Sequence, residues 1–201
     1  MTIGNGANAD RALRRAVSWA AALNLGYFAV EWVVARRIES VSLFADSIDF
    51  LEDTAVNLLV LVALGWPRRL RSRLGVPLVA LLLLPGGATL WTAWQKWLQP
   101  LPPAPLPLSL TALGALAVNL GCALLLARVR HAGGSLSRAA FLSARNDVWA
   151  SLAILAAAAL TLAWRSAWPD LAVGLAILAL SLDAAHDIYR SARDEHRGPS
   201  R

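Results

Sequence analysis

The sequence predicts an all-α protein: an integral membrane bundle of six transmembrane helices with both termini in the cytoplasm. Of its 201 residues, 57% are hydrophobic and only 16% are charged, whereas a typical soluble domain has roughly 25% charged residues. A soluble core could not bury that much apolar surface. The apolar residues also fall into six runs, each near the length of about 20 residues that a helix needs to cross a bilayer.

The runs are joined by short connections, and their approximate bounds are 16–35, 42–65, 76–96, 108–127, 138–163 and 170–188. The connection at 97–107 reads WLQPLPPAPLP, and its prolines predict an extended, non-helical link. Tryptophan rings favour the headgroup level of a bilayer, and four of them mark the ends of runs: Trp66, Trp97, Trp164 and Trp168. We expect a cytoplasmic segment at 1–15, a six-helix transmembrane domain at 16–190 and a short cytoplasmic tail at 191–201.

Basic residues predict the orientation. With the N-terminus inside, fourteen of them flank the cytoplasmic ends of the runs, and four flank the outer ends, namely Arg36, Arg37, Lys96 and Arg165. Basic residues favour the cytoplasmic side, so the sequence predicts a multi-pass protein of the cell membrane. A composition rich in Ala, Leu and Arg with a single lysine is typical of a GC-rich bacterial genome, hence of a bacterial inner membrane. Arginines facing anionic lipid account for the net charge of +6, so no nucleic-acid partner is expected.

Two pairs of short phrases resemble each other across the chain. ALNLG around Asn24 matches AVNLG around Asn119, and DTAVNLLVL from Asp53 is similar to DVWASLAIL from Asp147. The two halves would then form a 3+3 inverted repeat, which in secondary transporters places the site where the halves meet. Chance similarity between apolar segments is the alternative.

The second run carries an acidic stripe. Asp46, Asp49 and Asp53 fall within about 60° of one another on a helix of 3.6 residues per turn, and Glu52 lies beside them. Each acid inside a bilayer costs about 2.5–3.5 kcal/mol, so the stripe must face protein, water or a cation. A loop at 42–53 is the alternative, and it would leave too short a span.

The fifth run offers a matching face with Ser143, Asp147 and Ser151 at i, i+4, i+8 spacing and Asn146 beside it. If Asp147 meets the acidic stripe, carboxylate, hydroxyl and amide oxygens form a site suited to a divalent cation. Asp147 has a structural role in the alternative interpretation. Arg145 points away from Asp147, and an interhelical ion pair of Arg145 with Asp46 or Glu52 is also open.

Polar groups in the first and last runs are weaker candidates. Asn24 and Glu31 lie seven residues apart on one line of a helix. Glu31 either belongs to the cation path or pairs with Arg36 or Arg37. At the end of the sixth run, three groups at i, i+3, i+4 spacing form either a metal site at the inner mouth or an ordinary polar helix end: Asp183, His186 and Asp187. The single cysteine, Cys122, excludes a disulfide framework.

Together these residues resemble the cation diffusion facilitator family, whose members have six spans, both termini inside, and an x-x-x-D pair in each of helices two and five. The pairs here are Asp49 with Asp53, after the phrase SLFADS, and Ser143 with Asp147. The phrases NLGYFAVEW and WPDLAVGLAI are similar to the family as well. The resemblance covers roughly residues 16–192.

The resemblance implies a secondary transporter that exports a divalent metal cation from the cytoplasm by proton antiport. It implies no enzymatic activity and no cofactor, and the metal is the substrate. The metal ligands it implies are Asp49, Asp53, Ser143 and Asp147, with secondary candidates Asp46, Asn146, Asn24 and Glu31. A metal-dependent membrane enzyme and a non-transporting membrane subunit or sensor are the alternatives.

Three features depart from the family pattern. Asp49 and Ser143 stand where zinc transporters commonly have histidine, the loop RVRHAGGSLSR is not rich in histidine, and only a short tail follows the sixth run. The metal therefore stays open among manganese, iron, cobalt, zinc and magnesium, and an oxygen-only site favours the others over zinc. The short tail leaves the homodimer of the family open as well.

Overall fold

The computed structural model describes the backbone of residues 3–63, 75–130 and 134–197, and the side chains of 10–62, 87–130, 138 and 140–182. This part of the chain is all-α, as predicted. Its six helices are α1 (Ile3–Ile38), α2 (Val41–Ala63), α4 (Gly75–Leu98), α5 (Pro105–Ala127), α6 (Gly134–Trp164) and α7 (Trp168–Arg197). The acidic stripe is helical, so the alternative of a loop at 42–53 is wrong.

Two helices are much longer than the apolar runs predict. α1 begins at Ile3 and α7 ends at Arg197. The extra turns are rich in Ala and Arg, which are strong helix formers outside a membrane as well as inside it. A hydrophobic run indicates only the part of a helix that lies in the bilayer. The predicted start of α1 and the predicted end of α7 therefore fell short of the true helix ends.

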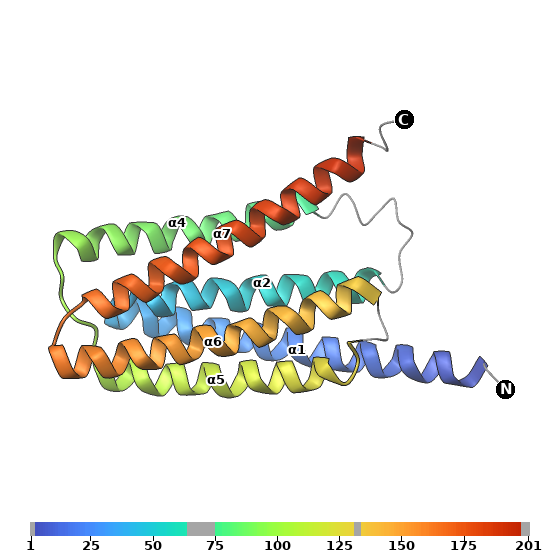
Figure 1. Ribbon diagram of the computed structural model, residues 1–201, viewed down its shortest axis with the longest axis horizontal. Coiled ribbons are helices and arrows are strands. Elements are labelled where there is room, and N and C mark those ends of the chain that lie inside the picture. The colour runs from blue at the N-terminus through green and yellow to red at the C-terminus, as the bar shows by residue number, and fades with distance from the viewer. Residues whose placement is uncertain (1–2, 64–74, 131–133, 198–201) are drawn as a thin grey trace.

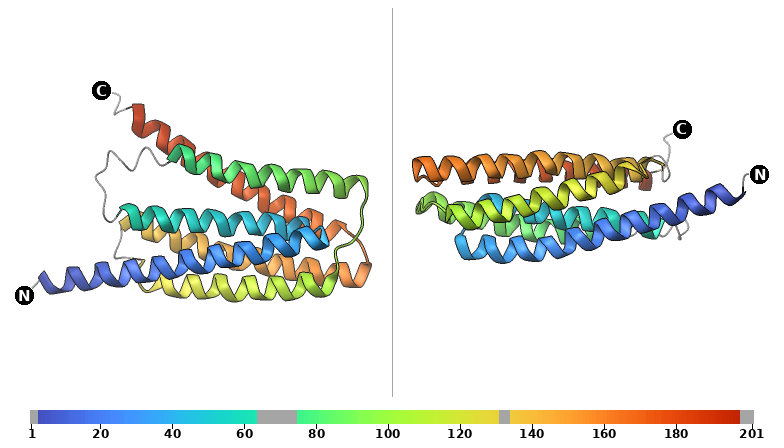
Figure 2. Two further views of the ribbon diagram at one scale, coloured as in Figure 1. Left: turned by 180° about the vertical axis from the view of Figure 1, so that it is seen from behind. Right: turned by 90° about the horizontal axis from the view of Figure 1, so that it is seen from below.

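The helices form one bundle with both termini at the same end (Figure 1). α2 packs against α1, α4, α6 and α7, while α5 packs against α1 and α6. α7 runs at an angle to α2 (Figures 1 and 2). The acidic stripe therefore lies on the helix that has the most neighbours, away from lipid.

The outer surface of the bundle is apolar. Large side chains such as Leu110, Trp149 and Leu180 are 61%, 68% and 72% exposed. Within the described residues, three segments are long and apolar enough to cross a membrane: Asp10–Ile38, Pro105–Ala127 and Ala140–Trp164. α2 is not apolar enough to be counted with them, because it carries four acids. The apolar part described in α7, Trp168–Leu182, is shorter. The fold is that of a helical membrane bundle.

α1 ends in a tight cap that sets the start of α2. Glu39 has a left-handed backbone with φ 52°, and the Ser40 N–H donates to the Ala35 carbonyl at 3.1 Å. This is the hydrogen bond of a Schellman cap. α2 therefore begins only three residues after α1 ends, which brings the two helices side by side.

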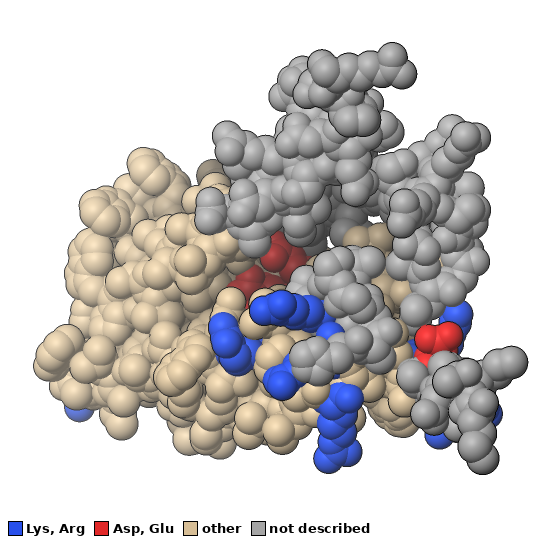
Figure 3. All heavy atoms as spheres, turned by 45° about the vertical axis from the view of Figure 1, so that its right-hand side comes forward, with Lys and Arg blue, Asp and Glu red and all other residues tan. Residues whose placement is uncertain are grey.

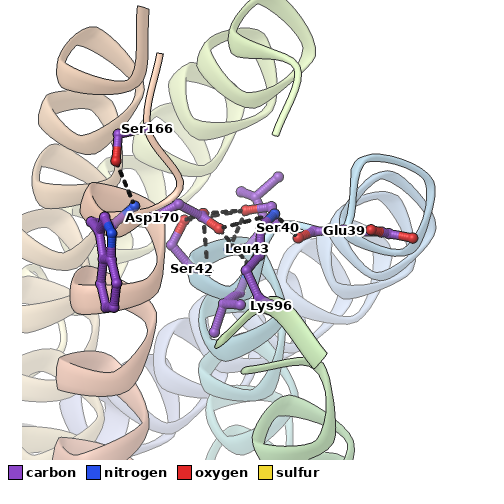
Figure 4. Close-up of polar contacts among 9 residues, drawn as sticks. Glu39, Ser40, Ser42, Leu43, Lys96, Ser166 and Asp170 are labelled. Carbon is purple, nitrogen blue, oxygen red and sulfur yellow. Dashed lines mark hydrogen bonds and ion pairs between the residues drawn. The ribbon is translucent and has the colours of Figure 1, made fainter. Parts of the chain in front are cut away.

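Asp170, in the first turn of α7, holds the start of α2 from another helix (Figure 4). The carboxylate is fully buried. It accepts hydrogen bonds from the Ser40 and Ser42 hydroxyls, both at 2.6 Å, and from the backbone N–H groups of Val41 and Ser42 at 2.9 and 3.2 Å. The first N–H groups of a helix have no partner within it, so Asp170 acts as the cap of α2.

Lys96 of α4 completes this network. Its ammonium lies 3.8 Å from the Asp170 carboxylate and donates to the Glu39 carbonyl. Gly174, one turn after Asp170, permits the close approach of α7, because a Cβ there would lie 2.6 Å from the Val41 carbonyl carbon. We call Ser40, Ser42, Lys96 and Asp170 the polar lock. It ties α2, α4 and α7 to the end of α1.

Candidate functional site

A cavity of about 620 Å³ lies between α2, α6 and α7. Its wall is apolar apart from six polar side chains: Asp49, Glu52, Ser143, Asn146, Asp147 and Ser181. Figure 3, viewed obliquely from the end that bears both termini, shows acidic atoms within a hollow and basic atoms near its rim. The cavity therefore brings polar groups of three helices to one space inside an apolar bundle.

Asp53 is buried beside the residues that line this cavity, with only 3% of its side chain exposed. The Ser143 hydroxyl of α6 donates to its Oδ1 at 2.8 Å. The Asn24 amide of α1 donates to its Oδ2 at 3.2 Å. Each oxygen of Asp53 thus has a neutral donor from a different helix, which fixes the carboxylate at the meeting point of α1, α2 and α6.

Asp147 of α6 faces Asp53 across the α2–α6 contact. The two carboxyl groups are close enough for a hydrogen bond when one of them carries a proton. Asp147 also lines the cavity. The structure therefore joins the second members of the two x-x-x-D pairs and adds Ser143 to them.

Arg145 takes no part in this arrangement. Its side chain is exposed and donates to the Asn146 amide oxygen at 3.4 Å. An ion pair with Asp46 was one alternative for Arg145, and it is wrong, because neither oxygen of Asp46 has a partner.

Asp49 has a partner that the sequence analysis missed. The Ser181 hydroxyl of α7 donates to its Oδ1, and both residues line the cavity. Ser181 is a polar residue within the apolar run of α7, and this interruption could have indicated that it faces a polar partner. Among the described side chains, no three His, Cys, Asp or Glu residues converge closely enough to hold a metal. Asp49 thus stands apart from Asp53 and Asp147 in this conformation.

The asparagines of the two similar phrases, Asn24 and Asn119, each contact the helix that follows in the comparison of the two halves. Asn24 of α1 donates to Asp53 of α2, and Asn119 of α5 donates to the Asp147 carbonyl of α6 at 3.4 Å and to the Ser151 hydroxyl at 3.1 Å. Each asparagine thus contacts the aspartate that the repeat assigns to it.

Glu31 and Asp46 form a separate pair between α1 and α2. Both side chains are fully buried, and none of their four oxygens has a hydrogen-bond partner among the residues that the structure describes. Pairing of Glu31 with Arg36 or Arg37 was one alternative and is wrong, because both arginines are exposed while Glu31 faces inward. Neither Glu31 nor Asp46 lines the cavity.

Three candidates of the sixth run cannot be placed. The side chains of Asp183, His186 and Asp187 lie outside the described residues, so the metal site proposed for them stays a prediction.

Comparison with protein families gives a match over most of the chain. The model of the cation efflux transmembrane domain matches residues 17–195. A comparison with curated proteins gives no match. The matched segment includes α2, α4, α5 and α6, most of α1 and α7, and every polar residue of the cavity.

Proposed function

The chain belongs to the cation efflux family, and from that premise we propose that it exports a divalent metal cation in exchange for protons through Asp53 and Asp147. Members of this family are cation transporters of the membrane, so the chain is a transporter and not an enzyme. One observation carries the proposal: two carboxyl groups from different helices face each other beside a cavity, inside an apolar bundle.

The charge of this site requires a positive partner. The groups that donate to Asp53 are a neutral hydroxyl and a neutral amide, and they leave its charge uncompensated. Two carboxylates sharing one buried place cannot both stay ionised without a cation or a proton between them. A divalent metal and protons can each supply that charge, so the same two groups can alternate between them. This alternation is what antiport requires.

The atoms that surround the site favour a hard cation. Asp53, Asp147 and Ser143 offer oxygens alone, and Asp49 would add another if it left Ser181. Oxygen ligands suit magnesium, manganese and related ions, whereas zinc commonly takes nitrogen and sulfur as well. We therefore place manganese, iron, cobalt and magnesium ahead of zinc as substrates.

The shape of the bundle supports alternating access. The acidic hollow is visible in an oblique view that brings the end with the termini forward (Figure 3), and at the opposite end the polar lock joins α7 to the start of α2. Rocking of helices around a fixed site is a common transport mechanism. We infer that the structure is the state that faces the cytoplasm, and that the polar lock separates when the site faces outward.

The test is metal-dependent proton flux in proteoliposomes that contain only this protein, across a panel of divalent ions. Asp49→Asn, Asp53→Asn and Asp147→Asn keep the shape of the side chain but remove its charge. We expect each to reduce flux on the order of tenfold or more, since about 1.4 kcal/mol of lost binding energy is a factor of ten. Asp10→Asn, which changes an exposed carboxylate, is the control. Parental flux in Asp53→Asn and Asp147→Asn would show that these acids are structural.

A further inference from the structure

The fully buried pair Glu31 and Asp46 has no role in the function proposed above. Glu31 comes from α1 and Asp46 from α2, and their carboxyl groups are within hydrogen-bonding reach of each other. All four oxygens are shielded from solvent, and within the described part of the chain no donor bonds to them. A buried acceptor without a donor costs about 1–3 kcal/mol, and more if it is charged. No donor of the described residues satisfies these oxygens, and a proton on one of the two carboxyl groups would supply one.

Among the described residues, no group that faces the pair carries a positive charge. The titratable groups that face it are Tyr27 of α1, Asp49 and Asp53 of α2, and Asp147 of α6. The Tyr27 hydroxyl donates elsewhere, to the Thr111 carbonyl of α5 at 2.6 Å. On the remaining neighbours of α2, the described charged groups nearest the start of the helix pair with each other: Lys96 of α4 and Asp170 of α7.

We propose that Glu31 and Asp46 form a proton-binding site, in which one proton is shared between the two carboxyl groups. The shared proton supplies the missing donor and removes one of two like charges. A metal ion fits the place less well, because magnesium and calcium take six or more oxygen ligands and the pair offers only its own four oxygens away from the cavity.

The position of the pair gives the proton a use. Asp46 lies one turn before Asp49 on the stripe that leads to Asp53, so the charge of the pair acts on the cation site through a short, poorly screened distance. A cation bound near Asp53 favours release of the proton from the pair. By linkage, the pair without its proton favours binding of the cation. This coupling rests on the proposed function, whereas the shared proton itself does not.

The proton is tested first without metal. Infrared spectra of the metal-free protein in lipid nanodiscs contain a carbonyl band for each protonated carboxyl group. Glu31→Gln and Asp46→Asn should each lose one such band and still fold, since an amide N–H can replace the shared proton. Asp10→Asn should lose none. An unchanged set of bands in both pair variants would overturn the proton site, whatever the protein transports.

The coupling is tested by titrating each protein with Mn²⁺ in a weakly buffered solution that contains a pH indicator. We expect Glu31→Gln to bind Mn²⁺ within about threefold of the parent and to release about one proton fewer per ion bound. An unchanged proton count would overturn the coupling. Loss of Mn²⁺ binding in Glu31→Gln would overturn the separation of the two sites. Absence of Mn²⁺ binding in the parent would count against the proposed function, and the infrared result would still decide the proton site.

Discussion

Replacing Asp170 by alanine should destabilise the bundle more than replacing an exposed carboxylate. The Asp170 side chain accepts two hydroxyl hydrogen bonds and two backbone hydrogen bonds at the start of α2. It is also the counter-ion of Lys96, whose side chain is 3% exposed. Asp170→Ala therefore removes a helix cap and leaves a buried ammonium without its partner.

The magnitude follows from the fate of each partner. The Ser40 and Ser42 hydroxyls lie 3.3 Å apart and can bond each other, so their loss costs little. The N–H groups of Val41 and Ser42 keep no acceptor, and Lys96 keeps only the Glu39 carbonyl. Removing one member of a buried ion pair costs about 3–5 kcal/mol, and loss of a cap about 1 kcal/mol. We expect the free energy of unfolding to fall by about 3–5 kcal/mol, because the two costs share the same groups.

The assay is reversible denaturant unfolding in detergent micelles, followed by tryptophan fluorescence. Asp10→Ala is the matched control and should change the free energy of unfolding by less than about 0.5 kcal/mol, as exposed substitutions do. Adding Lys96→Met to Asp170→Ala should recover part of the loss, because it removes the unpaired charge. Equal stability of Asp170→Ala and Asp10→Ala would show that Asp170 does not stabilise the bundle as a cap and counter-ion.

Three further predictions use other parts of the bundle. Gly174→Ala should lower the free energy of unfolding by about 1–3 kcal/mol through overpacking against Val41. Gly121→Ala, which has open space around it, should not. Denaturant unfolding compares the two variants, and an equal loss of stability would contradict the close α2–α7 contact. Ser143→His adds an imidazole ligand and should shift the preference toward zinc over manganese; competition binding measures this, and an unchanged ratio would place Ser143 outside the site. In a cysteine-free background, Asp10→Cys should be labelled only from the cytoplasm and Leu101→Cys only from outside; the reverse pattern would overturn the topology.

The sequence predicted the six helices apart from two of their ends, and it indicated which faces of α2 and α6 could meet. Spacing determines which residues share a face of one helix, and acids are too costly to face lipid. The stripe with Asp53 was therefore expected to turn inward. The face of the fifth run that carries Ser143 and Asp147 was expected to turn inward as well. These constraints act within single helices, where the geometry is fixed.

The remaining contacts depend on how neighbouring helices rotate and slide, which spacing within a helix does not determine. Asp49 meets Ser181 because α7 crosses α2 at that level. Glu31 turns toward Asp46 and not toward the arginines that follow it, because those arginines lie on the exposed side of α1. Asp170 caps a helix 128 residues earlier in the chain, and no local pattern indicates such a cap.

The central claim is that Asp53 and Asp147 hold the transported ion. The most direct measurement is anomalous diffraction from crystals of this protein grown with Mn²⁺. We expect a manganese peak between the two carboxyl groups, at about 2.0–2.6 Å from an oxygen of each, and its loss in crystals of Asp53→Asn. A manganese peak that touches neither Asp53 nor Asp147, or one that persists unchanged in Asp53→Asn, would contradict it.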